Sequence, residues 1–282
     1  MITRRSFILK SAAGTAALLA MNPFAEARGG NNKLNKFGYI TGILGKQLEG
    51  DWKKVLKETA SYGFSEIETG GYLGDSAKEF LKFCKDISLL PVAGGIPLTA
   101  NPDELNPKLD ALLELGMKYA VNYWPWTGGG PFMLEDCKKS AELLNKMGEL
   151  VQKKGLVFCW HNHNREFAAM EDGLPFDYLM SHTDEKLVHC EMDIYWVKKG
   201  GGDPLAMLKK YAGRIPILHV KDMAPGDAQD FECPGSGIID FPSIFAEAVK
   251  QDIQHYFVER DNCPDGMACL KSSGAYLKAL RF

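Results

Sequence analysis

The chain has 282 residues, of which 45% are hydrophobic and 24% charged, a composition typical of a globular protein with a large core. Its formal net charge of −3 lacks the basic excess with which proteins hold nucleic acid or an anionic membrane surface. The seven cysteines are odd in number and include no CxxC pair, so we expect neither a disulfide framework nor a zinc ribbon.

The first 27 residues have the pattern of an export signal. Arg4 and Arg5 precede an apolar run at residues 11–20, and Ala25 and Ala27 offer a small-x-small cleavage site. The apolar run is shorter than the roughly 20 residues of a membrane-spanning helix. We therefore predict a twin-arginine signal peptide at residues 1–27, export to the periplasm, and no stable membrane insertion after cleavage.

After this segment, eight short apolar runs alternate with eight amphipathic stretches. The strand-like runs lie at residues 36–43, 64–69, 90–95, 119–124, 155–162, 187–196, 215–222 and 255–260. The helical patterns lie at residues 51–63, 75–87, 101–116, 133–155, 175–183, 203–213, 241–251 and 266–280. The first helical pattern opens on Asp51, a suitable N-cap, and ends on Gly63, a suitable C-cap.

Eight strand–helix units predict an α/β protein with a single (β/α)8 TIM barrel over residues 28–282. An open doubly wound sheet would need a glycine-rich phosphate loop after its first strand. Residues 38–50 do not fit GxGxxG, which excludes that alternative.

In such a barrel the active site lies at the C-terminal ends of the strands. None of the six histidines precedes His161, so imidazole ligands come from the last four units. His161, Asp193, His219 and Glu259 end four successive strand-like runs. Two imidazoles and two carboxylates suit a divalent ion such as Mn²⁺, Zn²⁺, Co²⁺ or Mg²⁺. His182 and His255 lie elsewhere, and we assign them no chemical role.

Each ligand candidate also has a simpler interpretation. A lone histidine in a strand is more often a hydrogen-bonded core residue than a ligand. Asp193 could cap a helix, and Glu259 could pair with Arg260. Their shared position at strand ends favours the joint metal site.

The segments "YWVKKGGGDPLAMLKKYAGRIPILHVKDM", "GSGIIDFPSIF" and "YFVERD" resemble the xylose isomerase-like barrels of sugar phosphate isomerases and epimerases. The resemblance covers the mature chain and implies a divalent metal held at the ends of strands five to eight. Asp193, His219 and Glu259 match family ligands. Ketose epimerases carry a glutamate in a pattern like "LExxNR" where "WHNHNR" has His161. The resemblance thus implies His161 as a ligand and His163 facing the substrate.

The resemblance implies proton abstraction next to the carbonyl of a sugar. With one of two carboxylate bases replaced, isomerisation or elimination is favoured over symmetrical epimerisation. Glu259 or His163, whose unperturbed pKa is near 6.5, is the expected base. Lys221 either stabilises the developing charge or pairs with Asp222 on the surface.

The expected substrate is a non-phosphorylated sugar or keto-sugar, because no glycine-rich loop with basic residues stands out. Aromatic faces past strand ends can stack on a sugar ring, and polar side chains there can bind its hydroxyls. The expected substrate contacts are Glu68, Trp124, Trp126, Arg165 and Trp196.

Two other functions remain as alternatives. An abasic-site endonuclease shares this barrel but needs a three-metal cluster with histidines from strands two and three, where this chain has none. A non-catalytic sugar-binding barrel would keep the aromatic residues and need no metal. The sequence also leaves open whether copies of the chain assemble into a homo-oligomer.

Overall fold

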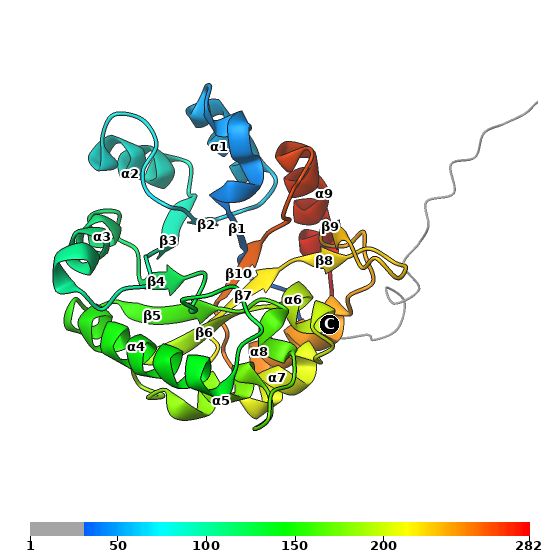
Figure 1. Cartoon of the computed structure of the whole chain (residues 1–282). Helices are drawn as coiled ribbons and strands as arrows, with labels where there is room; N and C mark the ends of the chain where they lie inside the picture. Colours follow the sequence, from blue (N-terminus) through cyan, green and yellow to red (C-terminus); the bar gives the residue numbers. More distant parts are fainter. Residues whose placement is uncertain (1–30) are drawn as a thin grey trace, which may run out of the picture.

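The computed structural model describes residues 31–282 (Figure 1). The signal peptide predicted at residues 1–27 lies outside the described residues. Among the helices of residues 31–282, none combines the length and the apolar character that a membrane crossing requires. Asn32 and Phe282 exchange two backbone hydrogen bonds of 3.2 and 3.1 Å. The two ends of the described part therefore lie side by side.

Eight parallel strands close into a barrel in the order β1-β10-β7-β6-β5-β4-β3-β2. This confirms the predicted (β/α)8 barrel, and each strand-like run of the sequence contains one barrel strand. The strands are β1 (Gly38–Ile40), β2 (Glu66–Glu68), β3 (Leu90–Gly95), β4 (Tyr119–Asn122), β5 (Val157–His161), β6 (Val188–Asp193), β7 (Ile217–Val220) and β10 (His255–Val258).

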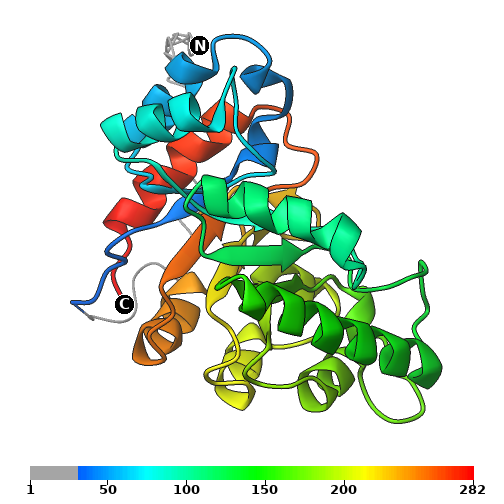
Figure 2. The same ribbon diagram turned by 90° about the vertical axis from the view of Figure 1, so that its left-hand side faces the viewer.

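Helices surround the strands on the outside of the barrel (Figures 1 and 2). They are α1 (Trp52–Ser61), α2 (Ala77–Asp86), α3 (Pro102–Glu114), α4 (Leu134–Lys153), α5 (Pro175–His182), α6 (Ile194–Lys199), α7 (Pro204–Lys210), α8 (Phe241–Lys250) and α9 (Gly266–Ala279). The predicted caps of α1 are present: the Asp51 carboxylate accepts a hydrogen bond from the Lys54 N–H, and Gly63 has a φ of +102°.

Several short elements were not predicted. They are α6, the 3₁₀ helices η2 (Thr41–Leu48) and η3 (Arg165–Phe167), and an antiparallel hairpin of β8 (Asp222–Met223) and β9 (Phe231–Glu232). Such elements are too short to show a hydrophobic period of their own. The disulfide Cys233–Cys269 was not predicted either, and it corrects the expectation drawn from cysteine number and spacing.

Side chains fill the inside of the barrel. A buried apolar group consists of Ala93, Tyr119, Val121, Cys159, Ile217 and Phe257. Gly38 makes room for the ring of Phe257, because a Cβ at that position would lie 2.7 Å from this ring. The barrel is therefore a packed core, and polar chemistry is confined to its two ends.

The N-terminal end of the barrel holds a charged cluster. Glu66 and His255 are the first residues of β2 and β10, and His255 Nδ1 is 2.9 Å from Glu66 Oε2. Lys36 donates a 2.6 Å hydrogen bond to the other oxygen of Glu66. His255 therefore lies at the end opposite the expected active site, in agreement with the sequence analysis.

This cluster generates a prediction about acid stability. Burial raises the pKa of Glu66, but the hydrogen bonds from His255 and Lys36 outweigh it and hold the pKa below its ordinary value. A lowered folded-state pKa contributes stability above the unfolded-state pKa, and that stability is lost as the pH falls through the folded-state value. Urea unfolding between about pH 6 and about pH 3.5 should therefore show a steeper loss of unfolding free energy for the native protein than for Glu66→Gln.

Glu149→Gln, on an exposed position of α4, is the matched control and should follow the native protein. Parallel curves for the native protein and Glu66→Gln would contradict the prediction.

Candidate metal centre

The structure brings together the four residues predicted to bind a metal. His161, Asp193, His219 and Glu259 each place one potential ligand atom within 4.8 Å of the other three. They come from the C-terminal ends of β5, β6, β7 and β10, and the pairing of Asp193 with His219 aligns two of them directly. His161 Nε2 is 3.8 Å from Asp193 Oδ2, and His219 Nδ1 is 2.8 Å from Glu259 Oε2.

Asp193 caps a helix with one carboxylate oxygen and directs the other toward the candidate ligands, although the sequence presented the two positions as alternatives. Its Oδ1 accepts a 2.8 Å hydrogen bond from the Trp196 N–H and so caps α6. Its buried Oδ2 accepts no hydrogen bond from the described residues, although it lies 3.0 Å from Lys221 Nζ. A buried carboxylate oxygen left without a hydrogen bond is suited to a cation. The donor set of two imidazoles and two carboxylates fits a divalent metal ion.

Glu191 completes the centre, and the sequence analysis missed it. Its Oε2 is 3.1 Å from His161 Nδ1 and 3.2 Å from His219 Nε2, and Glu68 Oε2 is 2.9 Å from the same His219 nitrogen. Each imidazole thus turns one nitrogen toward the four-residue group and the other toward a buried carboxylate, as metal-binding histidines usually do. Glu191 lies two residues before Asp193 in β6, so strand alternation places both on one face and could have found it.

The buried carboxylates determine the protonation of this centre. Burial, reinforced by Glu68, raises the pKa of Glu191 to about 8. Burial alone lowers the pKa of His219, but Glu191 and Glu68 outweigh it and hold that pKa well above its ordinary value. Lys221 and His219 overcome burial to hold the pKa of Glu259 well below its usual range. The centre thus balances its buried carboxylates with retained protons and with the charge of Lys221.

Lys221 is buried beside the candidate ligands. Its Nζ is 2.9 Å from Glu259 Oε2 and 2.7 Å from Asp261 Oδ2, and it lies 5.1 Å from the ring centre of Trp196. Burial lowers its pKa, but Asp193, Glu259 and Asp261 outweigh that effect and raise it, so the ammonium stays charged. The alternative of a surface pair with Asp222 was wrong.

Asp222 instead organises the segment that follows β7. It is buried, and its carboxylate accepts backbone hydrogen bonds of 2.8–3.1 Å. The donors are the N–H groups of Met223, Gly235, Gly237 and Ile239. This carboxylate holds the β8–β9 hairpin and the loop after it beside the barrel mouth.

His163 lies between two of the predicted aromatic contacts. Its ring centre is 5.2 Å from that of Trp124 and 5.4 Å from that of Trp196. Its buried Nδ1 has no hydrogen-bond partner among the described residues, while its backbone N–H donates to Glu166. Burial and then the charge of Lys221 lower the pKa of His163 to about 4. The ring is therefore neutral near pH 7, because its pKa lies below the unperturbed value near 6.5.

The remaining predicted substrate residues occupy different settings. Trp126 is buried, donates a 2.7 Å hydrogen bond to Glu166 and stacks on Phe132, so it packs beneath the mouth instead of facing it. Glu68 is buried, and besides contacting His219 it accepts a hydrogen bond from the Tyr123 hydroxyl. Arg165, the first residue of η3, is exposed.

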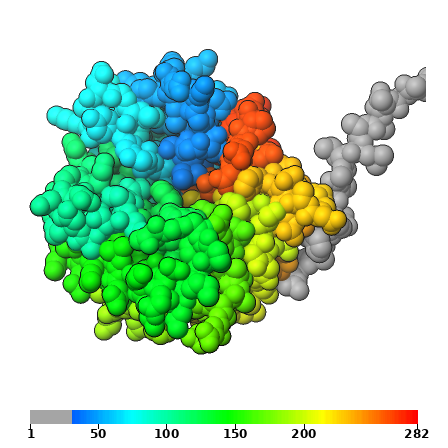
Figure 3. All heavy atoms as spheres, viewed as in Figure 1, coloured from blue at the N-terminus to red at the C-terminus, as the bar shows by residue number. Residues whose placement is uncertain are grey.

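A pocket of about 560 Å³ borders the centre on the side of β1 and β10. It is lined by residues 42–47 of η2 and by residues 259–264 after β10. The blue and orange-red atoms of these two regions meet at the surface in the space-filling view (Figure 3). Among the four candidate ligands Glu259 lies in the pocket wall, so the centre meets a cavity large enough for a small molecule at this residue.

The chain is similar in sequence and in structure to several known proteins. Inosose dehydratase of Clostridium beijerinckii is 30% identical over 238 residues, covering 72% of this chain and 78% of that protein. Inosose dehydratase of Clostridium botulinum is 34% identical over the same shares. A crystal structure of a sugar phosphate isomerase/epimerase from Parabacteroides distasonis is 26% identical, has a TM-score of 0.72, and covers 92% of this chain and 98% of that one.

Residues 56–280 match the family described as the xylose isomerase-like TIM barrel. That range contains seven of the eight barrel strands and all four candidate metal ligands. The match agrees with the resemblance found in the sequence and with the closed parallel barrel of the structure. The chain belongs to the xylose isomerase-like TIM barrel family.

Proposed function

We propose that the protein is a divalent-metal-dependent lyase that removes water from a non-phosphorylated keto-sugar or keto-cyclitol. The convergence of His161, Asp193, His219 and Glu259 beside the charged Lys221 carries this proposal. The relatives support an enzyme of the sugar isomerase, epimerase or dehydratase kind, and the two described as inosose dehydratases favour elimination within it.

The four candidate ligands would hold the metal, and Glu191 would hold both histidine rings in place from behind. When bound, a divalent ion supplies Lewis-acid polarisation of the ketone and of a neighbouring hydroxyl. Lys221 adds a fixed positive charge 2.9 Å from Glu259, where it stabilises negative charge that develops on the substrate oxygens.

Glu259 is the base in this mechanism. Lys221 and His219 hold its pKa low and keep it ionised, so a carboxylate oxygen is available to accept the proton on the carbon next to the ketone. The electron pair of that C–H bond first moves toward the ketone oxygen and gives an enolate, which can take a proton back. The enolate then reforms the ketone while the C–C double bond forms and the C–O bond to the β-hydroxyl breaks. Glu259 then returns the proton to the departing hydroxide, which leaves as water. A single carboxylate is enough for this sequence, in agreement with His161 standing where epimerases have a second glutamate.

His163 has a binding function in this proposal. Its neutral ring has a free, buried Nδ1 and lies between Trp124 and Trp196. A neutral imidazole there can hydrogen-bond a substrate hydroxyl while the two indoles contact the apolar face of the ring. This geometry favours substrate orientation over the proton transfer that the sequence suggested.

Glu259→Gln tests the base. Because an amide cannot accept the proton, turnover of an inosose should fall by about 10²–10⁴-fold, the usual range for a general base. The measurement is the rate of formation of a product lighter by one water, followed by mass spectrometry. Inosose recovered after partial turnover in D₂O should carry deuterium next to the ketone with the native protein and not with the variant. Glu149→Gln should behave as the native protein.

Sugar binding without any product or deuterium exchange, in protein shown to contain metal, would contradict the proposal. That outcome would favour the non-catalytic sugar-binding barrel.

Glu191→Gln tests the metal centre. The amide has one acceptor oxygen and no negative charge, so it holds the two imidazoles less firmly than the carboxylate does. The affinity for Mn²⁺ should therefore fall by about 10–100-fold. Calorimetric titration of metal-free protein measures this without reference to activity. Glu66→Gln is a matched control, since Glu66 is also a buried carboxylate that contacts a histidine, but at the opposite end of the barrel. Equal losses of affinity in both variants would contradict the assignment.

We also propose export through the twin-arginine signal at residues 1–27. The protein isolated from its natural source should then begin near Arg28, as determined by intact mass. Recovery of a chain that retains Met1, or unchanged export after Arg4 and Arg5 are both replaced by lysine, would contradict this proposal.

A further inference from the structure

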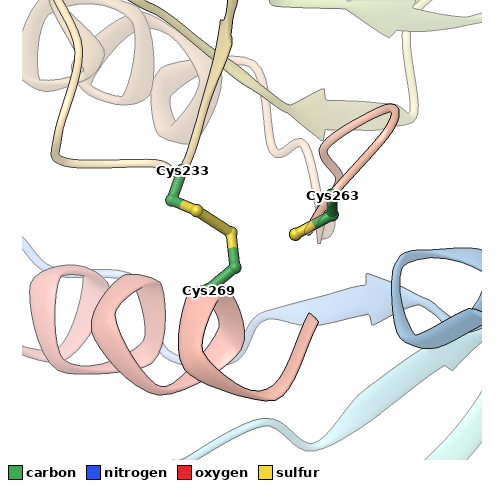
Figure 4. Close-up of side chains that lie close together, drawn as sticks. All are labelled: Cys233, Cys263 and Cys269. Carbon is green, nitrogen blue, oxygen red and sulfur yellow. A yellow bond between two sulfur atoms is a disulfide. The ribbon is translucent and has the colours of Figure 1, made fainter. Parts of the chain in front are cut away.

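Three sulfur atoms converge outside the metal centre. Cys233 and Cys269 form a disulfide with a Cα–Cα distance of 5.6 Å. The free thiol of Cys263 lies close by, and the three sulfurs are within 4.8 Å of one another (Figure 4). The other free cysteines of the described residues, Cys84, Cys137, Cys159 and Cys190, are buried elsewhere in the fold.

The three cysteines belong to segments that border the barrel mouth. Cys233 directly follows β9, whose Phe231 lies against Trp196. Cys269 is in the first turns of α9, and Cys263 is in the loop that connects β10 to α9, four residues after Glu259. The disulfide therefore fastens the hairpin segment to α9, while the third sulfur sits on the loop that leads from a candidate metal ligand.

The arrangement of the sulfurs favours attack on Cys269. The Cys263 side chain points toward the disulfide, and in the view of Figure 4 the sulfur of Cys269 lies between the other two. A thiolate attacks a disulfide along the S–S direction, with the far sulfur leaving. Cys263 is half-buried and lines the 560 Å³ pocket, so the attacking thiol also has contact with solvent.

Arg260 stabilises the sulfur that would leave. Its Nη1 is 3.2 Å from Cys233 Sγ and 3.1 Å from Glu232 Oε1. A guanidinium remains protonated and donates much more strongly to a thiolate than to a disulfide sulfur. The Cys233 thiolate is thus the better stabilised leaving group.

We propose that these residues form an internal thiol–disulfide exchange site. The Cys263 thiolate attacks Cys269 Sγ, a Cys263–Cys269 bond forms, and the Cys233–Cys269 bond breaks with its electron pair on Cys233. The proton that Cys263 loses is balanced by the one that Cys233 takes up, so the step consumes neither oxidant nor reductant. This inference is independent of the reaction proposed for the metal centre.

The exchange changes which segment is fastened to α9. In the first state the hairpin segment is held, and in the second the loop after β10 is held instead. That loop carries Asp261, which forms a 2.7 Å ion pair with Lys221. Burial raises the pKa of the Cys263 thiol, so attack proceeds through the minor thiolate fraction and is slow at neutral pH.

Tryptic peptide mapping distinguishes the two states, because trypsin places Cys233 on one peptide and the other two cysteines on another. Residues 222–250 carry Cys233, and residues 261–271 carry both Cys263 and Cys269. The intact protein is incubated without added thiol or oxidant, quenched in acid, alkylated while denatured, and digested without reduction. Before exchange the two peptides are linked and Cys263 is alkylated. After exchange, residues 222–250 are alkylated at Cys233, and residues 261–271 contain an internal disulfide.

Native protein should show both states, with at least about a tenth of the molecules exchanged at equilibrium. Cys263→Ser should retain the linked peptides alone. Arg260→Gln should slow exchange by about tenfold, because the leaving thiolate loses its guanidinium partner. Cys137→Ser, which replaces a buried free cysteine of α4, is the matched control and should exchange as the native protein does.

Native protein that keeps Cys263 alkylated and the two peptides linked after prolonged incubation would overturn the proposal. Cleavage before Asp265 separates Cys263 from Cys269, so a fragment joining Cys233 to Cys263 would also be detected and would contradict the assigned direction. Cys233→Ser provides a second measurement: after incubation with oxidised glutathione, which accepts the two electrons, its folded form should contain the Cys263–Cys269 bond. A folded variant with both thiols free would contradict the proposal.

Discussion

The mouth of this barrel is organised by the need to neutralise clustered, buried carboxylates. Glu68, Glu191 and Asp193 are fully buried, and Glu259 is close to them. Buried carboxylates without counter-charges are costly, so each must be protonated, paired or bound to a cation. This requirement explains why Lys221 is buried at a strand end, where a lysine would otherwise extend into solvent. It also explains why both imidazoles have carboxylates on two sides.

The two histidines of "WHNH" show how one local pattern yields two environments. Strand alternation places His161 and His163 on the same face, and that much follows from the sequence. His161 ends β5 and is buried among carboxylates, whereas His163 lies past the strand and packs between indoles. The difference arises from residues distant in the sequence, such as Trp196, which no local period reveals. The histidine nearest to fixed negative charge is suited to bind a metal, and the other to contact a ligand.

The sequence was sufficient for the barrel and for the four candidate ligands, because both depend on strand position. The positions of the surrounding side chains depend on how the loops fold back, which strand periodicity does not predict. Trp126 follows β4 just as Trp124 does, but its indole is drawn inward by the buried Glu166. Lys221 was open to two interpretations, because periodicity does not reveal three acidic partners, one at the end of β6 and two just after β10. Cys233 and Cys269 are 36 residues apart in segments with no shared pattern, so their bond was invisible until the fold was known.

The apolar layer around Phe257 separates two charged ends of the same barrel. His255 and Glu259 lie on one continuous stretch, four residues or roughly 13 Å apart, with buried aromatic and aliphatic side chains between them. Changes that share no partners across such a layer combine additively. The lower end can therefore accumulate substitutions that alter heat or acid tolerance while the upper end keeps its chemistry. In evolution, this separation allows the stability of the scaffold to change while its substrate specificity stays the same.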